Sequence, residues 1–369
     1  MVRLLSDPKL QAVIAGRGFW VLATEGTLKR SAKILDYPKP LGIFSEIAPN
    51  PTIAAVQKAA NAMKSNPPEI LLAIGGGSTL DTAKGVAALL CPELIQQSDW
   101  LSLHLRNGVP LPKEFQPLPI IAIPTTAGTG SEVTPFGTIW DEKTGAKYSI
   151  HHPKLFSEAA ILIPELTATQ PHDLSLFTGL DAFSHALETL WNRNRNPESV
   201  KLASGAVQKL LKHLPRVLKE PRNLESRREV QEASVWAGQA IAQNRTALAH
   251  SMSYPITSEL DVPHGLACSF SLGEVLRVNA QAELDQMKDV FFALSVKSAD
   301  EGVSRVYAFF KELGLAAELN KKIPGSAKLL GLKGKLIQAA RADNNLAQVD
   351  DLQARQILVR AWDQVMAQC

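Results

Sequence analysis

The sequence predicts two domains, an α/β domain with a parallel sheet at residues 1–164 and an all-α domain at residues 165–369. A chain of 369 residues is longer than one hydrophobic core usually serves. Its first part alternates short apolar runs with amphipathic segments, which is the rhythm of β–α–β units. From about Pro164 onward the apolar residues recur with the 3.6-residue helical period, and runs typical of strands almost disappear.

The elements of the first domain follow from local patterns. Short apolar runs bounded by turn residues predict buried strands at 19–24, 40–45, 69–75 and 119–124. An amphipathic run predicts a helix at 52–65, and a second helix is expected to begin near Asp81.

The second domain shows long helical patterns. Periodic apolar residues predict helices at 197–218, 229–243 and 300–314. Residues from about 322 to 348 carry glycine and proline between short helical runs, so no long element is expected there.

Composition and charge exclude several classes of function. Hydrophobic residues make up 45% of the chain and charged residues 20%, as in an ordinary globular protein. The net charge is +3 with both signs interspersed, so neither a nucleic acid nor a membrane surface is an expected partner. The first residues lack the apolar segment of a signal peptide, which predicts a cytoplasmic protein.

The three cysteines indicate no cross-linked framework. Cys91, Cys268 and Cys369 lie far apart and lack CxxC spacing. This pattern argues against disulfides and against a thiolate metal site, so we expect two packing residues and a terminal thiol.

Two spaced pairs of polar residues supply a ligand set for a divalent metal ion. Asp181 and His185 are four residues apart in a helical pattern, so they lie on one face of the expected helix. His250 and His264 are separated by Pro255 and Pro263, which are expected to break any helix between them and to let a loop bring the two imidazoles together. One carboxylate and three imidazoles suit a catalytic metal, although each residue alone could be an ordinary buried polar group.

Two turns rich in glycine and hydroxyl side chains follow predicted strands. The first contains Gly75, Gly76, Gly77 and Ser78, and its main-chain N–H groups can approach a phosphate. The second, at residues 125–132, has the same character. Two such turns at the carboxyl ends of strands favour a dinucleotide, although either alone can be purely conformational. Because the turns lie in the first domain and the metal ligands in the second, we expect the active site in the cleft between the domains.

Glu25 follows the strand expected at 19–24, where an acidic side chain can accept hydrogen bonds from an adenosine ribose. A carboxylate there repels a 2′-phosphate, which favours NAD(H) over NADP(H). A helix-capping or solvated glutamate is the alternative interpretation.

Five segments together resemble the iron-containing (group III) alcohol dehydrogenase family, whose fold is shared with dehydroquinate synthase. The match covers roughly residues 20–320, and it rests on APNPT at 48–52, AIGGGSTLDTAK at 73–84, IPTTAGTGSEVTPF at 123–136, GLDAFSHALETLW at 179–191 and AHSMSYPITSELDVPHGLA at 249–267. The resemblance implies a Rossmann-like α/β domain, an all-helical domain, and a divalent ion, usually Fe²⁺ and sometimes Zn²⁺. It implies that the ion is bound by Asp181, His185, His250 and His264.

The same resemblance implies which residues contact the dinucleotide and which aldehyde is reduced. The cofactor contacts fall on Asn50, Gly75, Gly76, Gly77, Ser78, Asp81, Thr125, Thr126, Ser131, Thr134 and Lys147. The segments 125–141, 186–199, 243–257 and 262–272 look most like the branch that reduces phosphonoacetaldehyde to 2-hydroxyethylphosphonate. A short-chain alcohol dehydrogenase that uses another aldehyde, such as the 1,3-propanediol, lactaldehyde or ethanol type, is the alternative within the family.

The chain departs from the family pattern at two places. Many members carry a second histidine four residues after the third ligand, where it relays a proton, and this chain has Tyr254 there. A phenol can still hold a hydrogen bond but releases its proton less readily than an imidazole. The chain also begins almost directly at the first expected strand, without the N-terminal edge hairpin usual in the family.

A phosphonate substrate needs cationic partners. The candidates are Arg193, Arg195 and Arg245, with Asn192, Asn194 and Asn244 beside them, because these residues flank the metal-ligand segments. An arginine can bind a phosphonate through two N–H groups, which lysine cannot. Arg245 is the strongest candidate because it lies just before His250, and solvated helix ends are the alternative role for all three arginines.

Other classes fit the sequence less well. A lyase of the dehydroquinate synthase type needs more cationic groups near its metal, and a glycerol dehydrogenase is expected to differ in its ligand set and in the 125–132 turn. A binding protein without catalytic activity is expected to show no stabilisation by NAD and Fe²⁺. The pattern does not decide the oligomeric state, for which a homodimer is one candidate.

Overall fold

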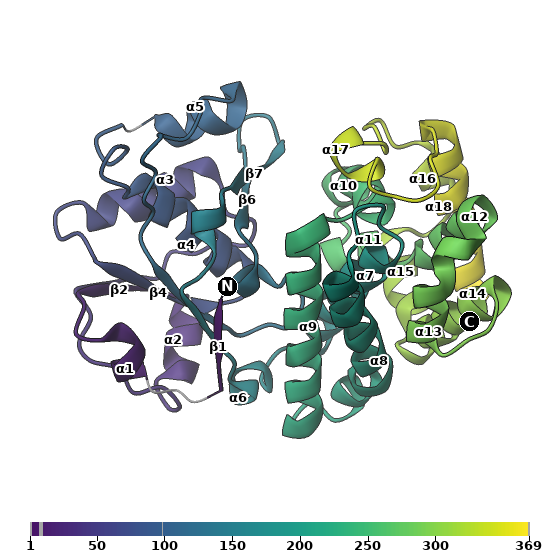
Figure 1. Ribbon diagram of the computed structural model, residues 1–369, viewed down its shortest axis with the longest axis horizontal. Helices are drawn as coiled ribbons and strands as arrows, with labels where there is room; N and C mark the ends of the chain where they lie inside the picture. Colours follow the sequence, from purple (N-terminus) through teal and green to yellow (C-terminus); the bar gives the residue numbers. More distant parts are fainter. Residues whose placement is uncertain (1, 7–9, 98, 368–369) are drawn as a thin grey trace. The chain divides into compact units, whose positions relative to one another are not determined.

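The computed structural model describes residues 2–6, 10–97 and 99–367, which form two compact units. Unit 1 comprises residues 1–126 and 131–167, and unit 2 comprises residues 127–130 and 168–369. Figure 1 shows strands in unit 1 and helices throughout unit 2. Among the described residues, no helix combines the length and the apolar composition needed to cross a bilayer.

Unit 1 is built around a parallel sheet of six strands in the order β1-β8-β5-β4-β2-β3. The strands are β1 (Arg3–Leu5), β2 (Phe19–Leu22), β3 (Gly42–Phe44), β4 (Ile70–Gly75), β5 (Ile120–Pro124) and β8 (Ala159–Ile161). β4 pairs with β2 on one side and with β5 on the other, all in parallel register. The carboxyl ends of β4 and β5, from which the two glycine-rich turns depart, are therefore neighbours at one edge of the sheet.

Alternation along the strands divides the interior of unit 1 into two cores. Leu71 and Ala73 of β4 face a core shared with helices α3 (Ile53–Met63) and α4 (Gly77–Leu89), whereas Leu72 and Ile74 face a core shared with α1 (Leu10–Ile14). The helices of unit 1 are α1 (Leu10–Ile14), α2 (Glu25–Ser31), α3 (Ile53–Met63), α4 (Gly77–Leu89), α5 (Trp100–Asn107) and α6 (Pro164–Thr167). Both faces of the sheet are thus covered, which explains why its central strands are continuous apolar runs.

Unit 2 is helical and has one large core. Its helices are α7 (His172–Leu190), α8 (Pro197–Lys219), α9 (Leu224–Asn244), α10 (Leu248–Leu260), α11 (His264–Ser269), α12 (Leu272–Glu283), α13 (Lys288–Leu294), α14 (Ala299–Glu312), α15 (Leu315–Lys322), α16 (Ala327–Leu330), α17 (Ala339–Ala342) and α18 (Asp351–Met366). α7, α8 and α9 pack on one another, and α11 packs on both α7 and α10. Asn196 caps α8 through a reciprocal pair of hydrogen bonds with Ser199, and Asn223 caps α9.

The fold class expected from the sequence is confirmed, and several details differ. β1, β8 and the antiparallel hairpin of β6 (Phe136–Trp140) and β7 (Lys147–His151) gave no clear sequence signal. These strands are short, and the hairpin strands mix polar and apolar residues. Among the described residues, β1 is the first strand; it pairs with β8 and precedes the strand at 19–24 that was predicted to be the first.

Two helix boundaries also differ from expectation. α4 begins at Gly77, before the expected start near Asp81, because Gly76 takes the N-cap position. Pro255 does not break its helix but lies inside α10. The buried side chains of Met252 and Ile256 continue the apolar face of α10 across the proline, which offsets the lost main-chain hydrogen bond.

Candidate metal centre and dinucleotide-binding turns

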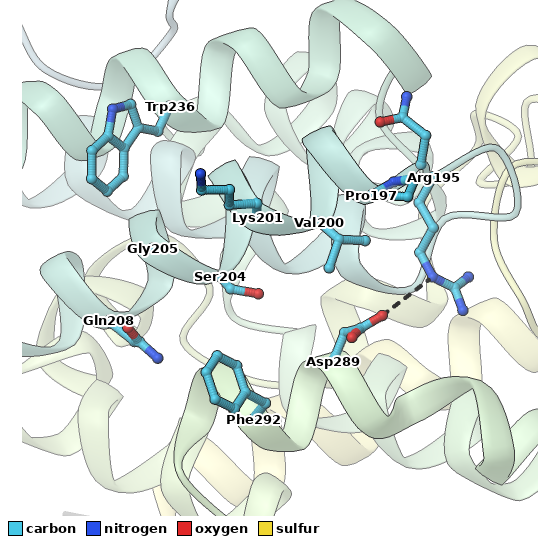
Figure 2. A pocket seen from close by; sticks show the side chains of 11 residues that line it. Arg195, Pro197, Val200, Lys201, Ser204, Gly205, Gln208, Trp236, Asp289 and Phe292 are labelled. Atoms are coloured by element: carbon cyan, nitrogen blue, oxygen red, sulfur yellow. Dashed lines mark ion pairs between the residues drawn. The ribbon is translucent and has the colours of Figure 1, made fainter.

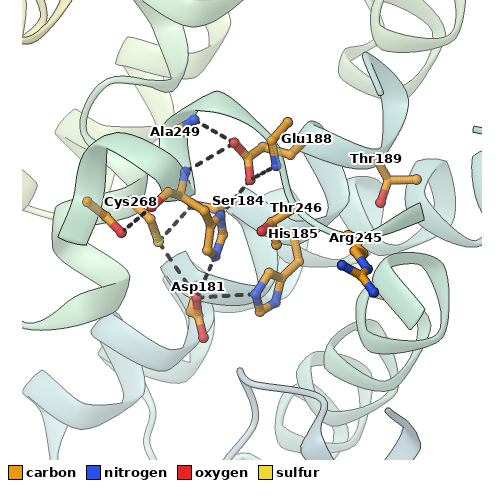
Figure 3. Close-up of polar contacts among 12 residues, drawn as sticks. Asp181, Ser184, His185, Glu188, Thr189, Arg245, Thr246, Ala249 and Cys268 are labelled. Carbon is orange, nitrogen blue, oxygen red and sulfur yellow. Dashed lines mark hydrogen bonds and ion pairs between the residues drawn. The ribbon is translucent and has the colours of Figure 1, made fainter. Parts of the chain in front are cut away.

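Asp181 lies at the centre of a cluster of nitrogen donors in unit 2. Its Oδ1 atom is 3.5 Å from His185 Nε2, 3.5 Å from His250 Nε2 and 3.8 Å from His264 Nε2. Figure 3 shows Asp181 and His185 pointing toward each other from α7. The structure therefore brings together all four residues that the sequence pattern and the family resemblance single out.

Three helices position these four side chains. Asp181 and His185 lie one turn apart on α7, His250 is the third residue of α10, and His264 is the first residue of α11. Pro263 precedes α11, and its fixed φ suits the start of a helix. The pair Asp181 and His185 and the pair His250 and His264 thus form a single cluster, because α11 packs on both α7 and α10.

Glu188 orients His250 from the side opposite Asp181. Its carboxylate lies 2.5 Å from His250 Nδ1 and accepts hydrogen bonds from the main-chain N–H groups of Ala247, Ala249 and His250. Burial opposes ionisation of Glu188, but the attraction of His250 and these hydrogen bonds lower its pKa. An ionised Glu188 holds a proton on Nδ1, so Nε2 is the atom of His250 that faces the cluster, where a metal ion would take the place of a second proton.

The donor set fits a divalent metal ion. His250 is 3% exposed, and its Nε2 atom has no hydrogen-bond partner among the described residues. Bonds of about 2.1 Å to oxygen and nitrogen place tetrahedral ligand atoms about 3.4 Å apart, close to the observed separations. A buried nitrogen atom that faces a carboxylate without a hydrogen bond is otherwise costly, and a metal cation at this position satisfies both groups.

The protonation states of two ligands also suit a metal. Burial lowers the pKa of His185 to about 4 despite the attraction of Asp181, so its imidazole is neutral near pH 7. Burial favours protonated Asp181, but His185, His250 and His264 together hold its pKa well below the usual range. An ionised carboxylate and a neutral imidazole are the forms that coordinate metals.

We expect Glu188→Gln to weaken metal binding without removing a ligand. An amide donates as well as accepts, so it no longer fixes the His250 tautomer, and the loss in metal affinity is expected to be about 10–100-fold. Competition with a chromophoric chelator measures this loss. Glu165→Gln, an exposed carboxylate on α6, is the control and should bind metal as the unmodified protein does. Equal affinities for Glu188→Gln and the control would contradict the orienting role.

Cys268 also reaches this cluster. Its Sγ atom lies 3.6 Å from Asp181 Oδ1 and 3.5 Å from Ser184 Oγ, and the side chain is buried. The sequence predicted that Cys268 is only a packing residue, because it lacks CxxC spacing. That spacing detects only metal sites whose cysteines are close together in the sequence. Its position four residues after His264 could have indicated a shared site, because residues four apart lie on one face of a helix. Cys369 lies outside the described residues.

The first glycine-rich turn links β4 to α4 with little space for side chains. A Cβ atom on Gly75 would lie 2.1 Å from Thr79 Oγ1, and one on Gly76 would lie 3.0 Å from Thr126 Cγ2. Gly76 is the N-cap of α4 and makes no side-chain capping hydrogen bond. The amino end of α4 therefore offers main-chain N–H groups and a favourable helix dipole to an anion such as a pyrophosphate.

Asn50 lies beside this turn. Its main-chain N–H donates to Ser78 Oγ at 3.2 Å, and its φ angle is 55°, a left-handed conformation that asparagine tolerates better than most residues. Thr125 follows β5, and its N–H donates to the carbonyl of Gly75. The structure thus gathers Asn50, Gly75, Ser78 and Thr125 at one edge of the sheet.

A buried network supports the second turn. Asp81 accepts hydrogen bonds from Ser131 Oγ at 2.7 Å and from Thr138 N at 3.1 Å. Lys84 donates to the Ser131 carbonyl at 2.6 Å, to Ser131 Oγ at 2.9 Å and to Thr134 Oγ1 at 3.2 Å. Asp81, Ser131 and Thr134, expected to contact the dinucleotide, are thus engaged with one another or with Lys84.

Lys84 was not predicted as a site residue, because a lysine in a helix is usually solvated. It is 1% exposed, and burial lowers its pKa to about 8 although Asp81 and Glu132 attract it. Its ammonium group ties α4 to the segment after β5, which fixes the second turn relative to the first.

Two further expected cofactor contacts lie at exposed or half-buried positions. Glu25 is the exposed first residue of α2, directly after the N-cap Thr24. This position suits both a ribose contact and the helix-capping alternative. Lys147 is in β7, with its ammonium group 5.8 Å from the centroid of the Trp140 ring.

The candidate arginines differ in how their guanidinium groups are used. Arg193 donates to the carbonyls of Asn345 and Leu346, and Arg195 donates to the carbonyl of Asn192 and to Gln286. Figure 2 shows Arg195 directed toward Asp289 of α13, in a pocket lined mainly by residues of α8 and α13. Arg195 Nε lies 4.0 Å from Asp289 Oδ2. Both arginines therefore hold neighbouring segments of unit 2 together.

The three asparagines near these arginines also make structural contacts. Asn194 donates from Nδ2 to Asn344 Oδ1 at 2.9 Å. Asn192 is buried and donates to the carbonyls of Asn244 and Arg245, both at 3.1 Å. Asn192 thereby anchors the main chain that leads from α9 to α10.

Arg245 occupies a strained main-chain position in that link. Its φ and ψ angles are 62° and 179°, a region essentially restricted to glycine. Its guanidinium group is exposed and has no partner among the described residues. The main-chain N–H of Ala247, two residues later, donates to Glu188 at 3.1 Å. This hydrogen bond connects the segment of Arg245 to the ligand cluster, and Figure 3 draws both.

A further arginine approaches the cluster from α17. The Arg341 guanidinium lies over the ring of Tyr254, 4.9 Å from its centroid. The Tyr254 ring is parallel to that of His264, with centroids 6.5 Å apart. Asn344, near Arg341, donates to the carbonyl of Thr246 beside Arg245. Arg341 was not predicted as a site residue, because it lies in the four-residue helix α17, within the segment 322–348 that shows no clear helical pattern.

Comparisons with known proteins agree with this architecture. Residues 9–164 match the family described as iron-containing alcohol dehydrogenase. Residues 175–361 match the C-terminal region of the Fe-containing alcohol dehydrogenase family. Together the two matches cover most of the chain.

Two curated relatives illustrate the range of names within the family. Phosphonoacetaldehyde reductase of Streptomyces viridochromogenes is 34% identical over 252 residues, which are 67% of this chain and 62% of that protein. 1-Propanol dehydrogenase PduQ of Salmonella typhimurium is 32% identical over 240 residues, which are 65% of this chain and 60% of that protein. The matched part of the chain thus spans somewhat less than two thirds of the length of either relative.

A solved structure is similar over nearly the whole chain. Sulfoacetaldehyde reductase from Bifidobacterium kashiwanohense in complex with NAD⁺ has a TM-score of 0.87 and 27% identity, over 99% of this chain and 97% of that one. The family matches, the fold and the relatives lead to one conclusion. The chain belongs to the iron-containing alcohol dehydrogenase family.

Proposed function

We propose that the protein reduces an aldehyde to a primary alcohol with NADH and a divalent metal ion, and that its preferred substrate is phosphonoacetaldehyde. In this reaction the aldehyde carbon gains a hydride, its oxygen gains a proton, and 2-hydroxyethylphosphonate and NAD⁺ are released. The observation that carries the substrate assignment concerns Arg245, which is exposed and whose guanidinium has no partner among the described residues. It lies two residues before Ala247, whose N–H donates to Glu188.

The metal centre of this proposal consists of Asp181, His185, His250 and His264, with Fe²⁺ preferred and Zn²⁺ as the alternative. When bound, the ion polarises the aldehyde carbonyl and stabilises negative charge on its oxygen. Glu188 acts on the cluster only through His250, so it is a positioning residue.

The glycine-rich turn between β4 and α4 is proposed to bind the pyrophosphate of the dinucleotide, because the amino end of α4 has no side-chain cap and offers main-chain N–H groups to an anion. Lys84 keeps the second turn in place through Ser131. Glu25 favours NADH over NADPH through its negative charge at the end of β2. The NAD⁺ bound to the similar sulfoacetaldehyde reductase agrees with this choice.

Arg245 and Arg341 are proposed to bind the anionic end of the substrate. Arg341 lies over the Tyr254 ring, which is parallel to that of the ligand His264. Arg245 lies two residues before Ala247, which donates to Glu188. The guanidinium groups of Arg193 and Arg195, in contrast, are engaged in structural hydrogen bonds. A phosphonate requires such partners, because burying an unpaired anion is costly. Two relatives are named for two-carbon aldehydes with an anionic group, phosphonoacetaldehyde and sulfoacetaldehyde.

Tyr254 is proposed to guide the proton that the alcohol oxygen receives. It lies one turn after His250 on α10, the place where family members with a relay carry a second histidine. Its ring is parallel to that of His264 and lies against the guanidinium of Arg341. Water supplies the proton in this account, and the phenol orients it by a hydrogen bond.

A generic short-chain alcohol dehydrogenase is the second candidate. The similarity to 1-propanol dehydrogenase PduQ favours it, because the identity is nearly that of the phosphonoacetaldehyde reductase. A neutral aldehyde needs no cationic partner, so the two candidates differ in their dependence on Arg245. A cytoplasmic location and a homodimer stay predictions from the sequence and the family.

We expect Arg245→Ala to raise KM for phosphonoacetaldehyde by about 10–100-fold while changing KM for propionaldehyde less than about threefold. The reason is that a charged hydrogen bond of about 1.5–3 kcal/mol is lost only for the anionic substrate. Steady-state NADH oxidation with both aldehydes measures the difference.

Arg305→Ala is the matched control, because Arg305 is exposed on α14 and should affect neither substrate. An equal loss for the anionic and the neutral aldehyde in Arg245→Ala would contradict the anion-binding role and favour the generic dehydrogenase.

A further inference from the structure

A fifth donor lies at the ligand cluster, and the proposed reaction does not use it. Four donor atoms, from Asp181, His250, His264 and Cys268, all lie within 4.8 Å of one another. This group contains Cys268 rather than His185, although His185 Nε2 is also 3.5 Å from Asp181 Oδ1. We propose that the centre has two alternative ligand sets, in which Cys268 replaces His185 when a thiophilic ion such as Zn²⁺ is bound.

The positions of the donors suit this second set. His264 and Cys268 are four residues apart on α11, as Asp181 and His185 are on α7, so each helix presents a pair of donors on one face. The Sγ atom of Cys268 is 3.6 Å from Asp181 Oδ1. Bonds of about 2.3 Å to sulfur and about 2.1 Å to oxygen give a tetrahedral separation of about 3.6 Å.

The environment of Cys268 also points to a ligand role. The side chain is fully buried, and beside it the buried Nε2 atom of His250 lacks a hydrogen-bond partner among the described residues. The contacts of the thiol with Ser184 Oγ and with the Gly265 carbonyl are both 3.5 Å, and sulfur forms only weak hydrogen bonds. Little is therefore lost when the sulfur turns to a cation.

The two sets differ in charge and in preferred metal. When the thiol binds M²⁺, its S–H bond breaks, an S–M bond forms and the proton leaves to solvent. Asp181 and a Cys268 thiolate then neutralise the ion, whereas Asp181 with three neutral imidazoles leaves a net charge near +1. Thiolate ligands favour Zn²⁺, and imidazole suits Fe²⁺ as well. The neutral set polarises a carbonyl less, so Cys268 makes the centre discriminate between ions in function as well as in affinity.

This inference rests on the proposed metal centre, and Co²⁺ tests both separately. Co²⁺ is titrated anaerobically into the metal-free full chain, because it occupies zinc sites and is coloured. Its d–d bands report binding, and a near-ultraviolet sulfur-to-cobalt charge-transfer band reports a thiolate ligand. The variants are Cys268→Ala, Cys268→Ser and the double variant Cys91→Ala/Cys369→Ala, in which Cys268 is the only one of the three cysteines that remains.

The expected result is a charge-transfer band in the unmodified protein and in the double variant, and no such band in Cys268→Ala or Cys268→Ser. Competition with a chelator should show that Cys268→Ala lowers the affinity for Zn²⁺ at least about tenfold and the affinity for Fe²⁺ less than about threefold. A tenfold loss is a low bound, because removing even a residue that only hydrogen-bonds to a metal ligand can cost that much. Circular dichroism of the metal-free proteins checks that each variant is folded.

Three other outcomes overturn the inference. The d–d bands without a charge-transfer band in the unmodified protein would exclude Cys268 as a ligand and leave the proposed four-ligand centre intact. A band that disappears in the double variant would assign the thiolate to another cysteine. The absence of d–d bands would contradict the metal centre itself and with it this inference. The double variant makes the test decisive even if both Cys268 variants fail to fold.

Discussion

Replacement of Asp181 by asparagine is expected to remove the metal ion and to lower kcat/KM at least about 10³-fold, which corresponds to about 4 kcal/mol of transition-state stabilisation. Asp181 Oδ1 lies 3.5–3.8 Å from the Nε2 atoms of His185, His250 and His264, so its charge is shared by the whole cluster. Asparagine keeps the shape of the side chain, and the effect should therefore arise from the lost charge.

Metal content by elemental analysis and NADH oxidation together check this prediction. Asp289→Asn is a suitable control, because Asp289 is a half-exposed carboxylate on α13 with one arginine partner. The control should keep its metal and its rate. An Asp181→Asn enzyme with stoichiometric metal and a rate within about tenfold of the unmodified enzyme would contradict the ligand assignment.

Gly265→Ala is expected to be the most damaging small substitution at the site. A Cβ atom on Gly265 would lie 1.8 Å from the Phe177 carbonyl oxygen and 3.2 Å from Asp181 N, both main-chain atoms of α7. These atoms cannot rotate away, so α11 must move from α7 and carry His264 and Cys268 with it. We expect a loss of about 1–3 kcal/mol in the free energy of unfolding and a metal affinity at least about tenfold lower.

Chemical denaturation of the metal-free protein and chelator competition measure the two effects. Gly325→Ala is the matched control, because an added Cβ there meets nothing within 4 Å. Its stability should change by less than about 0.5 kcal/mol. If Gly265→Ala matched this control in both measurements, the close contact of α11 with α7 would not position the ligands.

Local periodicity was sufficient to predict the main elements of this fold. The central strands β4 and β5 are continuous apolar runs because both faces of the sheet are covered. The amphipathic pattern of α8 likewise marks a helix with one buried face. The pairing of Asp181 with His185 was predictable for the same reason, since four residues make about one helical turn.

Contacts between distant segments could not be predicted in this way. Cys268 meets Asp181 only because α11 packs on α7, and Arg341 meets Tyr254 only because the segment with α17 returns to α10. Lys84 is buried because four oxygen acceptors from residues 131–136 surround its ammonium group. In the segment containing Arg193 and Arg195, the sequence suggested substrate contacts, whereas the structure uses both guanidinium groups to hold unit 2 together.

Pro255 shows the limit of a local rule. A proline usually ends a helix, yet α10 continues through it because Met252 and Ile256 are buried on either side. Tertiary packing of a few apolar side chains outweighs one missing main-chain hydrogen bond. His250 therefore lies in a helix, α10, that continues to Leu260, and a short link connects it to α11, which begins at His264.

The most direct test of the account is to measure the rate of NADH oxidation by the enzyme loaded anaerobically with Fe²⁺ and by the metal-free enzyme. Phosphonoacetaldehyde is compared with sulfoacetaldehyde, acetaldehyde, propionaldehyde and lactaldehyde as the substrate. The account predicts activity only with metal and a kcat/KM for phosphonoacetaldehyde about 100-fold or more above that of the neutral aldehydes, equivalent to about 2.7 kcal/mol. Equal rates with all aldehydes would contradict the anionic substrate, and equal rates with and without metal would contradict the proposed centre.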